Sequence, residues 1–449
     1  MLPIIELFEQ FGYNQSYRCI DKIDDNQSSL LRLKGSHIRT VKRMCKDEMC
    51  LKIDCNEHKI EFQTSYFVGV DWIVENQLSV YVQPKLNKDT AEINYIKMLL
   101  DAIQEPENIK HLDELVYIDF HKPAIQINQS QDILSPFLIA QYLQLLKMIV
   151  RKGLKKSYYT VTENMNAKVK GKILIGANIK QNTVIGRHTH TICQYQEFGV
   201  NCDENKILKR AYQLSRNVIQ QYKSVIDIQP ITELINYIHP AFEQVTENID
   251  INKVKQYKPN PIYKEYQQAI KLAILILKRF SYNITKTEDK QVNTPPFWID
   301  MSKLFELYTF SKLRKVFPHS GEVMYHIGAV QNQELDFLIK SNDEKYIFVV
   351  DTKYKPQYEN GMVKVEDIRQ VSGYARIKSV YNKLGYNDYN HLLKCLIIYS
   401  HQICDDHLTV DHFDLGSEND IKQLREEKGY AEFYKLGIKL PEMQKKQVQ

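Results

Sequence analysis

The sequence predicts a multidomain α+β protein with a β-rich N-terminal domain, a mainly helical middle region, and a C-terminal domain in which helices flank a mixed sheet. Three observations predict this class. Apolar and polar residues alternate over much of the first 130 or so positions, helical periods follow Ser135, and a hairpin of short apolar strands follows the break at Thr294-Pro295-Pro296. We therefore place the domains at residues 1–132, 133–290 and 291–449.

Length and composition narrow the class further. The 449 residues suffice for two or three domains, and 60 basic against 55 acidic residues leave a net charge of only +5. Affinity for DNA must then come from local patches. The eight cysteines fit a reducing compartment. No apolar run reaches the roughly 18 residues of a membrane span, and MLPIIELFEQF lacks the basic start of a signal peptide. We expect a cytoplasmic protein with no membrane contact.

In the N-terminal domain, four stretches alternate as strands do and turn residues separate them. These strands are expected within residues 36–44, 48–55, 58–74 and 77–86. In the middle region, Ser135 reads as a helix cap and Pro136 as the first helical residue. Further helices are expected at 204–223, 231–244 and 261–280.

A basic, aromatic segment follows the first of these helices, at residues 151–172. Its cations are Arg151, Lys152, Lys155, Lys156, Lys168, Lys170 and Lys172. They either contact phosphates or form a solvated face, and the sequence favours neither.

Three groups of cysteine and histidine invite a metal interpretation, and none has the tight paired spacing of zinc ribbons. The groups are Cys45, Cys50, Cys55 and His58; His188, His190 and Cys193; and His401, Cys404, His407 and His412. The second is typical of ordinary sheet residues. Acidic residues interrupt the third, as in a polar surface loop, and whether it binds metal stays open.

The hairpin of the C-terminal domain carries the most informative residues. Asp336 lies in its first strand, Leu335–Ile339, while Asp351 and Lys353 close its second, which begins as Tyr346–Val350. Residues two apart in a strand share a face, so two carboxylates and an ammonium meet there. Like charges held together resist ionising, and Mg²⁺, which takes oxygen ligands, is the expected cofactor.

The predicted helices on either side of the hairpin add polar groups. One starts near Asp300 or Ser302 and places Glu306 on an otherwise apolar stripe. The other follows the hairpin and carries Gln370 and Tyr374 on one face, together with Asp367.

This order of elements resembles the PD-(D/E)xK nuclease core, and the Gln-x-x-x-Tyr pair resembles its RecB-like members. The resemblance implies that the metal is bound or supported by Asp336, Asp351 and Glu306. It implies that Lys353 orients the attacking water and stabilises developing charge, and that Gln370 and Tyr374 complete the catalytic set. Leu335 stands where the family name has proline, a position that shapes the strand. Asp-x-Lys alone is common by chance, and only the combination is specific.

Other segments resemble the McrC family. They are Val82-Gln83-Pro84-Lys85, Gly171-Lys172-Ile173, Tyr195-Gln196-Glu197 with Asn205-Lys206-Ile207-Leu208-Lys209, Asp300-Met301, Phe305-Glu306, and Asp351-Thr352-Lys353-Tyr354-Lys355. The resemblance spans roughly residues 66–374. It implies an endonuclease subunit of an McrBC-type restriction system. Such a subunit cuts DNA together with an McrB-like AAA+ hexamer, a GTPase or ATPase, which it stimulates through its N-terminal domain. Self-association through the nuclease domain is compatible with it.

Two alternatives remain open at this stage: a RecB-like nuclease of DNA repair or end processing, and a non-catalytic activator of an AAA+ motor. The chain has no G-x-x-x-x-G-K-[ST] loop and no helix-turn-helix or zinc-finger signature. Nucleotide hydrolysis and sequence reading are therefore expected in the partner.

Overall fold

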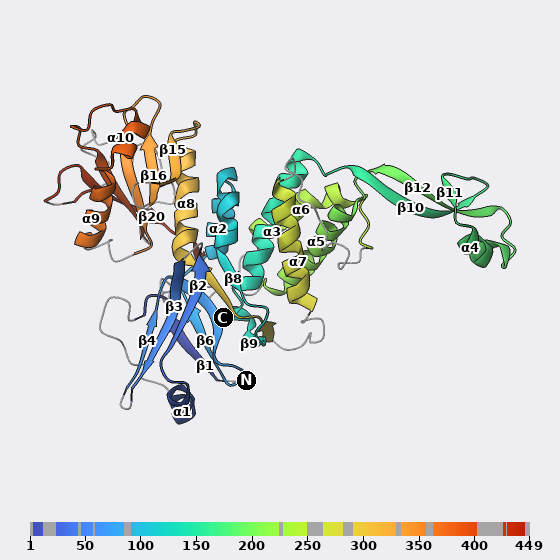
Figure 1. The fold of residues 1–449 in the computed structure, drawn as a ribbon, viewed down its shortest axis with the longest axis horizontal. Coiled ribbons are helices and arrows are strands. Elements are labelled where there is room, and N and C mark those ends of the chain that lie inside the picture. Colours follow the sequence, from blue (N-terminus) through green and yellow to red (C-terminus); the bar gives the residue numbers. More distant parts are fainter. Residues whose placement is uncertain are drawn as a thin grey trace. The chain divides into compact units, whose positions relative to one another are not determined.

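The computed structural model describes residues 3–11, 24–43, 46–56, 59–84, 91–223, 228–248, 264–281, 291–328, 334–355, 362–401, 425–427 and 429–444. It is an α+β structure with several separate sheets, as the sequence predicts (Figure 1). The chain divides into two units. The first combines Met1–Phe137 with Lys290–Gln449, and the second is Leu138–Asp289. Among the described residues, no helix is long and apolar enough to cross a membrane.

The N-terminal part of the first unit is rich in strands, which confirms that expectation. One sheet has the order β1-β6-β5-β14-β8 and another the order β2-β3-β4. Their bounds are β1 Ile4–Phe8, β2 His37–Arg43, β3 Lys46–Cys55, β4 Ile60–Thr64, β5 Phe67–Val74, β6 Leu78–Gln83, β8 Val116–Ile118 and β14 Phe297–Asp300. Alternate residues of both sheets, with Leu31 of helix α1 (Asp25–Lys34), form a shared apolar core.

A buried carboxylate fastens β14 into this sheet. Asp71 on β5 is 3% exposed, and its Oδ2 accepts a hydrogen bond from Trp298 Nε1 on β14 at 3.3 Å. Arg39 Nε lies 3.2 Å from the same oxygen, and Lys122 Nζ lies 3.0 Å from Oδ1. Two cations and an indole N–H satisfy the charge, as a buried carboxylate requires. A strand that follows residue 290 is therefore built into the N-terminal sheet.

The second part of this unit is a six-stranded mixed sheet in the order β15-β16-β17-β18-β20-β19. Strands β15 to β17 are antiparallel neighbours, and β17, β18 and β20 run parallel. The bounds are β15 Val323–Gly328, β16 Glu334–Lys340, β17 Ile347–Lys353, β18 Lys394–His401, β19 Arg425–Glu426 and β20 Phe433–Lys439. The hairpin β16–β17 confirms the two strands expected from the sequence.

Helices connect and flank this sheet. Helix α8 (Met301–Val316) begins directly after β14, and Asp300 accepts a hydrogen bond from the N–H of Lys303 at 2.9 Å as its N-cap. Helices α9 (Val365–Tyr374) and α10 (Lys378–Leu384) lie in the crossover between β17 and β18, and both contribute to the core against the sheet. A crossover of this kind is what parallel neighbouring strands need.

Short elements join the two parts of the first unit. Strand β13 (Gln291–Thr294) pairs with β9 (Ile125–Asn128), and β21 (Glu442–Gln444) pairs with β7 (Ala91–Ile93). The remaining elements of this part are α2 Tyr95–Ile103 and the 3₁₀ helices Pro106–Glu114 and Gln129–Gln131. Strands from both sides of the boundary predicted at 290/291 thus pair in the same sheets. No sequence pattern indicated this pairing.

The second unit consists of helices and a long β-arm. The helices are α3 Leu134–Lys152, which the unit shares from Leu138 on, α5 Asp203–Gln221, α6 Gln229–Ile238, the 3₁₀ turn His239–Phe242 and α7 Lys264–Ser281. The predicted cap of α3 is wrong. The helix starts at Leu134, and the oxygen that accepts the N–H of Ser135, at 3.1 Å, belongs to Asp132.

The β-arm is formed by β10 (Ser157–Asn166) and β12 (His190–Gly199), paired over ten residues, with β11 (Lys172–Ile173), α4 (Ile175–Asn178) and the π-turn Ile179–Thr183 at its tip (Figure 1). Buried Asn205 of α5 anchors its base, since its amide donates to the carbonyls of Lys155 and Val200 and accepts from Tyr266. Of the basic residues predicted in this segment, Lys152, Lys155 and Lys170 form ion pairs with Glu265, Glu204 and Glu197.

The pairing of β5 with β14 predicts a strong effect at Gly69. A Cβ at this position would lie 2.0 Å from the carbonyl oxygen of Phe297. We expect Gly69→Ala to lower the free energy of unfolding by about 2 kcal/mol or more, because backbone on β14 would have to move. Chemical denaturation measures this. Gly176→Ala, where a Cβ meets nothing within 4 Å, is the matched control. Equal stability of the two variants would contradict the pairing.

Candidate active site

Two aspartates lie side by side where the hairpin β16–β17 meets the middle of the six-stranded sheet. Phe337 pairs with Val350, so Asp336 faces Asp351 at the next position, and residues opposite one another point to the same side. Asp351 is 2% exposed and Asp336 is half-buried. The predicted proximity of these carboxylates is therefore what the strand register produces.

Each aspartate has its own partners. Oδ2 of Asp336 accepts two hydrogen bonds from Thr352, one from the backbone N–H and one from the hydroxyl, both at 2.7 Å. Oδ2 of Asp351 lies 2.6 Å from Nζ of Lys353. Burial raises the pKa of Asp336 well above its usual value, and the charges of Asp351 and Glu306 raise it further. Burial also raises the pKa of Asp351, although the Lys353 charge opposes the change.

Lys353 connects the strand end to helix α9. Its Nζ donates a hydrogen bond to Oε1 of Gln370 at 3.0 Å, and the amide of Gln370 donates to the hydroxyl of Tyr374 at 2.8 Å. Burial works against the charged form of Lys353, but the carboxylates around it, Asp351 first, outweigh burial and raise its pKa. The ammonium is thus fixed beside Asp351 and stays charged at neutral pH.

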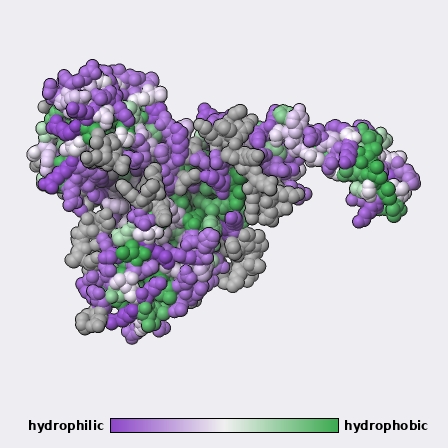
Figure 2. Space-filling model, in the orientation of Figure 1, coloured by the Kyte–Doolittle hydropathy of each residue, from purple (hydrophilic) through white to green (hydrophobic). Residues whose placement is uncertain are grey.

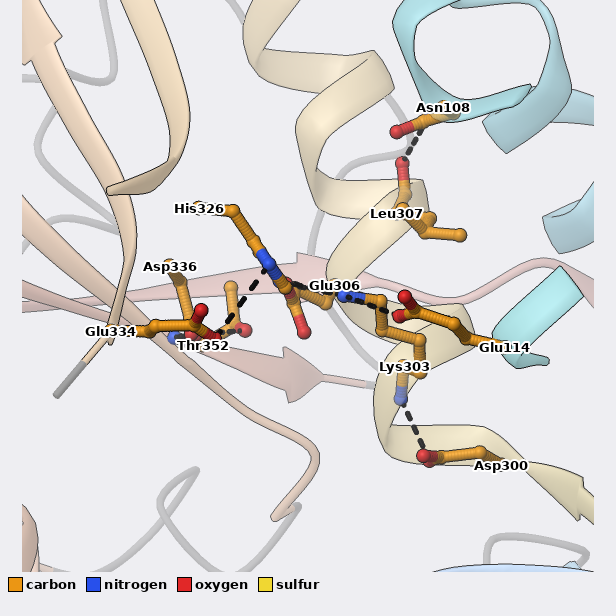
Figure 3. A network of polar contacts seen from close by, with 10 residues as sticks. All are labelled: Asn108, Glu114, Asp300, Lys303, Glu306, Leu307, His326, Glu334, Asp336 and Thr352. Atoms are coloured by element: carbon orange, nitrogen blue, oxygen red, sulfur yellow. Dashed lines mark hydrogen bonds and ion pairs between the residues drawn. The ribbon is translucent and has the colours of Figure 1, made fainter. Parts of the chain in front are cut away.

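Glu306 of α8 belongs to a neighbouring network (Figure 3). Its Oε1 lies 2.9 Å from Nε2 of His326 and 3.2 Å from Nζ of Lys303. Burial favours the protonated form of Glu306. The hydrogen bond with His326 and the Lys303 charge reverse this preference and lower its pKa to about 2. The charge of Glu306 acts on both aspartates.

The structure brings the six predicted site residues to one region of the sheet, but not into a single cluster of acids. Among the described residues, no group of three His, Cys, Asp or Glu side chains could hold a metal ion. Asp336 and Asp351 fit Mg²⁺ as a pair. A bound cation would reduce the repulsion between the two carboxylates. Mg²⁺ is commonly bound by one or two carboxylates and keeps several of its water ligands. The predicted ligand role of Glu306 stays a prediction.

Several residues of this region were missed in the sequence. Lys303 and Lys355 had detectable signals. Lys303 lies one helical turn before Glu306 in the sequence. Lys355 lies two residues after Lys353, the spacing of residues on one face of a strand, and its Nζ lies 2.8 Å from Oδ2 of Asp367 on α9. His326 had none, because it lies in strand β15 with no motif around it.

The three cysteine and histidine groups considered in the sequence lie partly outside the described residues. Cys45, His58, Cys404, His407 and His412 lie outside the described residues. Cys50 and Cys193 are buried, and burial raises the pKa of the Cys50 thiol. No metal group includes the described members.

Comparisons with known proteins give one family and two structures. The family described as McrBC 5-methylcytosine restriction system component matches residues 63–386. No curated protein matches. One similar structure is a refined half-complex from a tetradecameric assembly of Thermococcus gammatolerans McrB AAA+ hexamers with bound McrC, at 14% identity and a TM-score of 0.36, covering 86% of this chain and 80% of that chain. Another is the cryo-EM structure of the Thermococcus gammatolerans McrBC complex, at 14% identity and a TM-score of 0.32, covering 84% and 99%.

The raised pKa of Asp336 predicts that this carboxylate destabilises the metal-free protein. When the pKa of a carboxyl is higher in the folded than in the unfolded protein, the group does not change the free energy of unfolding at a pH below its unfolded pKa. It lowers the free energy of unfolding as the pH rises from the unfolded pKa towards the folded pKa. Asp336→Asn keeps the acceptor for Thr352 and removes the charge. We expect it to raise the Tm in EDTA at pH 8 by about 2–4 °C.

Differential scanning calorimetry at pH 4 and pH 8 measures this effect. The gain should shrink at pH 4, and Mg²⁺ should raise the Tm of the wild type more than that of the variant. A lower Tm for the variant at pH 8 would contradict the interpretation.

Proposed function

The chain belongs to the family of McrBC 5-methylcytosine restriction system components, and on this premise we propose that it is the DNA-cleaving subunit of such a system. Its reaction would be Mg²⁺-dependent hydrolysis of phosphodiester bonds at a PD-(D/E)xK type site. The observation that carries the proposal is the set Asp336, Asp351 and Lys353 on adjacent positions of β16 and β17. A non-catalytic activator would have no need for this set.

The roles of the residues follow from their contacts. Asp336 and Asp351 would hold the metal, which supplies Lewis acidity and lowers the pKa of a bound water. Lys353, the half-buried cation beside Asp351, would orient the attacking water and stabilise the charge that develops on the phosphate. Gln370 and Tyr374 would keep the Lys353 ammonium in place through their hydrogen-bond chain. Thr352 would hold the Asp336 carboxylate through two hydrogen bonds.

Substitution of two site residues tests the proposal. We expect Lys353→Met to reduce cleavage about 10²–10³-fold, because one stabilising charge is lost from the transition state. Asp351→Asn should reduce cleavage below detection, because it removes a metal ligand. The assay is cleavage of plasmid DNA with partner, nucleotide and Mg²⁺, and circular dichroism checks folding. Lys315→Met, at an exposed lysine of α8, is the control for loss of a lysine. Undiminished cutting by folded Asp351→Asn would refute the site.

We further propose that the partner is an McrB-like AAA+ hexamer with GTPase or ATPase activity, as the family resemblance implies. The same resemblance implies that the β-rich segment before Ser135 carries the stimulation of the partner. The β-arm of the second unit is a second candidate surface. Its tip exposes apolar side chains, and Figure 2 shows them gathered at the end of the arm (Figure 2). They are Ile173, Ile175, Ile179, Val184 and Ile185, each at least 41% exposed.

Asparagine side chains inside the tip of the β-arm hydrogen-bond to one another. Asn182 is 1% exposed and exchanges two amide hydrogen bonds of 2.9 Å with Asn164, and it donates a third to Asn178. Asn178 in turn accepts from the N–H of Ile192 at 3.1 Å. Side-chain amides thus fix the loop while aliphatic side chains face outward. An exposed apolar patch on a rigid support is typical of a protein-binding surface.

Charge substitutions distinguish the two surfaces. We expect the double variant Val184→Asp/Ile185→Asp to reduce stimulation of the partner's nucleotide hydrolysis roughly tenfold or more, because a carboxylate would be buried in the interface. Leu33→Asp, at a residue of α1 that is 86% exposed, is the matched variant in the N-terminal domain. Steady-state hydrolysis rates measure both. The reverse result would assign stimulation to the N-terminal domain.

A further inference from the structure

A buried lysine lies beside the candidate site and takes no part in the roles given above. The side chain of Lys303 is fully buried in the first turn of α8. Its Nζ contacts Oε1 of Glu306 at 3.2 Å and Nε2 of His326 at 2.6 Å, and Oε2 of Glu114 lies 3.9 Å away. Removing an ammonium from water is unfavourable unless its partners are fixed around it. The positions of these partners are therefore coupled to one another.

His326 reaches the same oxygen of Glu306 from the sheet. In β15, Tyr325 pairs with Phe337 and Ile327 with Leu335, so His326 stands opposite Asp336. His326, Asp336 and Asp351 thus form one row across three neighbouring strands. The imidazole Nε2 lies 2.9 Å from Oε1 of Glu306, and Figure 3 shows the ring directed at this carboxylate.

The backbone of His326 has an uncommon conformation. Its φ is 49°, in the left-handed region that residues other than glycine seldom adopt inside a strand. Such conformations persist where the surroundings hold them, and they cluster at functional sites. Here the ring packs against Tyr325, with centroids 4.4 Å apart, and against His111, at 5.3 Å. These contacts fix the direction of the imidazole.

We propose that Lys303 and His326 are positioning residues that fix the Glu306 carboxylate of the neighbouring network, so that metal binding and DNA cleavage depend on both residues although neither touches the metal. The inference rests on the proposed nuclease function and adds two residues to it. Both contacts converge on one oxygen, Oε1, and they come from two different elements, α8 and β15. A carboxylate held from two sides cannot rotate freely. Groups that orient a metal site in this way generally matter almost as much as the ligands.

Four single variants of the full-length chain test the inference. His326→Leu and Lys303→Met remove one contact each at similar side-chain size, and His326→Gln keeps a hydrogen-bonding group near the position of Nε2. Lys315→Met, at an exposed lysine of the same helix, is the control. The readouts are the Tm, Mn²⁺ binding followed by electron paramagnetic resonance, and the Mg²⁺ concentration that gives half-maximal cleavage with partner and nucleotide.

We expect His326→Leu and Lys303→Met to weaken Mn²⁺ binding about 10–100-fold and to raise the Mg²⁺ requirement of cleavage in parallel. His326→Gln should recover most of both, and Lys315→Met should behave as the wild type. Folded His326→Leu and Lys303→Met with wild-type Mn²⁺ affinity would overturn the inference, as would losses in His326→Gln as large as those in His326→Leu. A wild type that binds Mn²⁺ in the expected way yet cuts no DNA would instead refute the proposed function.

Discussion

The repulsion between two neighbouring carboxylates, one buried and one half-buried, is the constraint on which this site depends. The register of β16 and β17 places Asp336 opposite Asp351. The groups around the two aspartates supply positive charge and hydrogen-bond donors. Lys353 provides a positive charge within 2.6 Å, and Thr352 donates two hydrogen bonds to the partner carboxylate. The remaining repulsion between the two acids is the reason that the proposed function includes a bound Mg²⁺ ion.

The scaffold of the site extends into the N-terminal sheet. Strand β14 lies between β5 and β8 and leads without a loop into α8, the helix that carries Lys303 and Glu306. Glu9, at the end of β1, raises the pKa of buried Tyr354 in addition to the effect of burial, and Tyr354 directly follows Lys353. Both sides of the site are thus supported by strands that precede it by more than 180 residues in the sequence.

The sequence predicts local features well and long-range pairings poorly, for physical reasons. The hairpin, the start of α8 at its Asp300 cap and the face of α9 follow from periodicity and capping, which act over a few residues. The insertion of β14 between β5 and β8 depends on a partner for Trp298 that lies 227 residues away, and no local pattern encodes it. His326 escaped notice because its significance arises only from the register of β15 with β16. The cap of α3 shows the same limit on a small scale, since Asp132 and Ser135 are both good caps and only the backbone geometry decides between them.

The central position of β14 also has a consequence for synthesis on the ribosome. Until Trp298 emerges, the edge of β5 and all of β8 have no strand to pair with, and Asp71 lacks the indole N–H among its partners. At about 5–20 residues per second, the 227 intervening residues take roughly 10–45 s to appear. During that interval the nascent chain carries an open, apolar sheet edge, the kind of surface that other chains and chaperones bind. Slow translation between residues 74 and 297 would prolong the exposure of this edge, so the yield of folded protein is tied to the pace at which the middle of the chain is made.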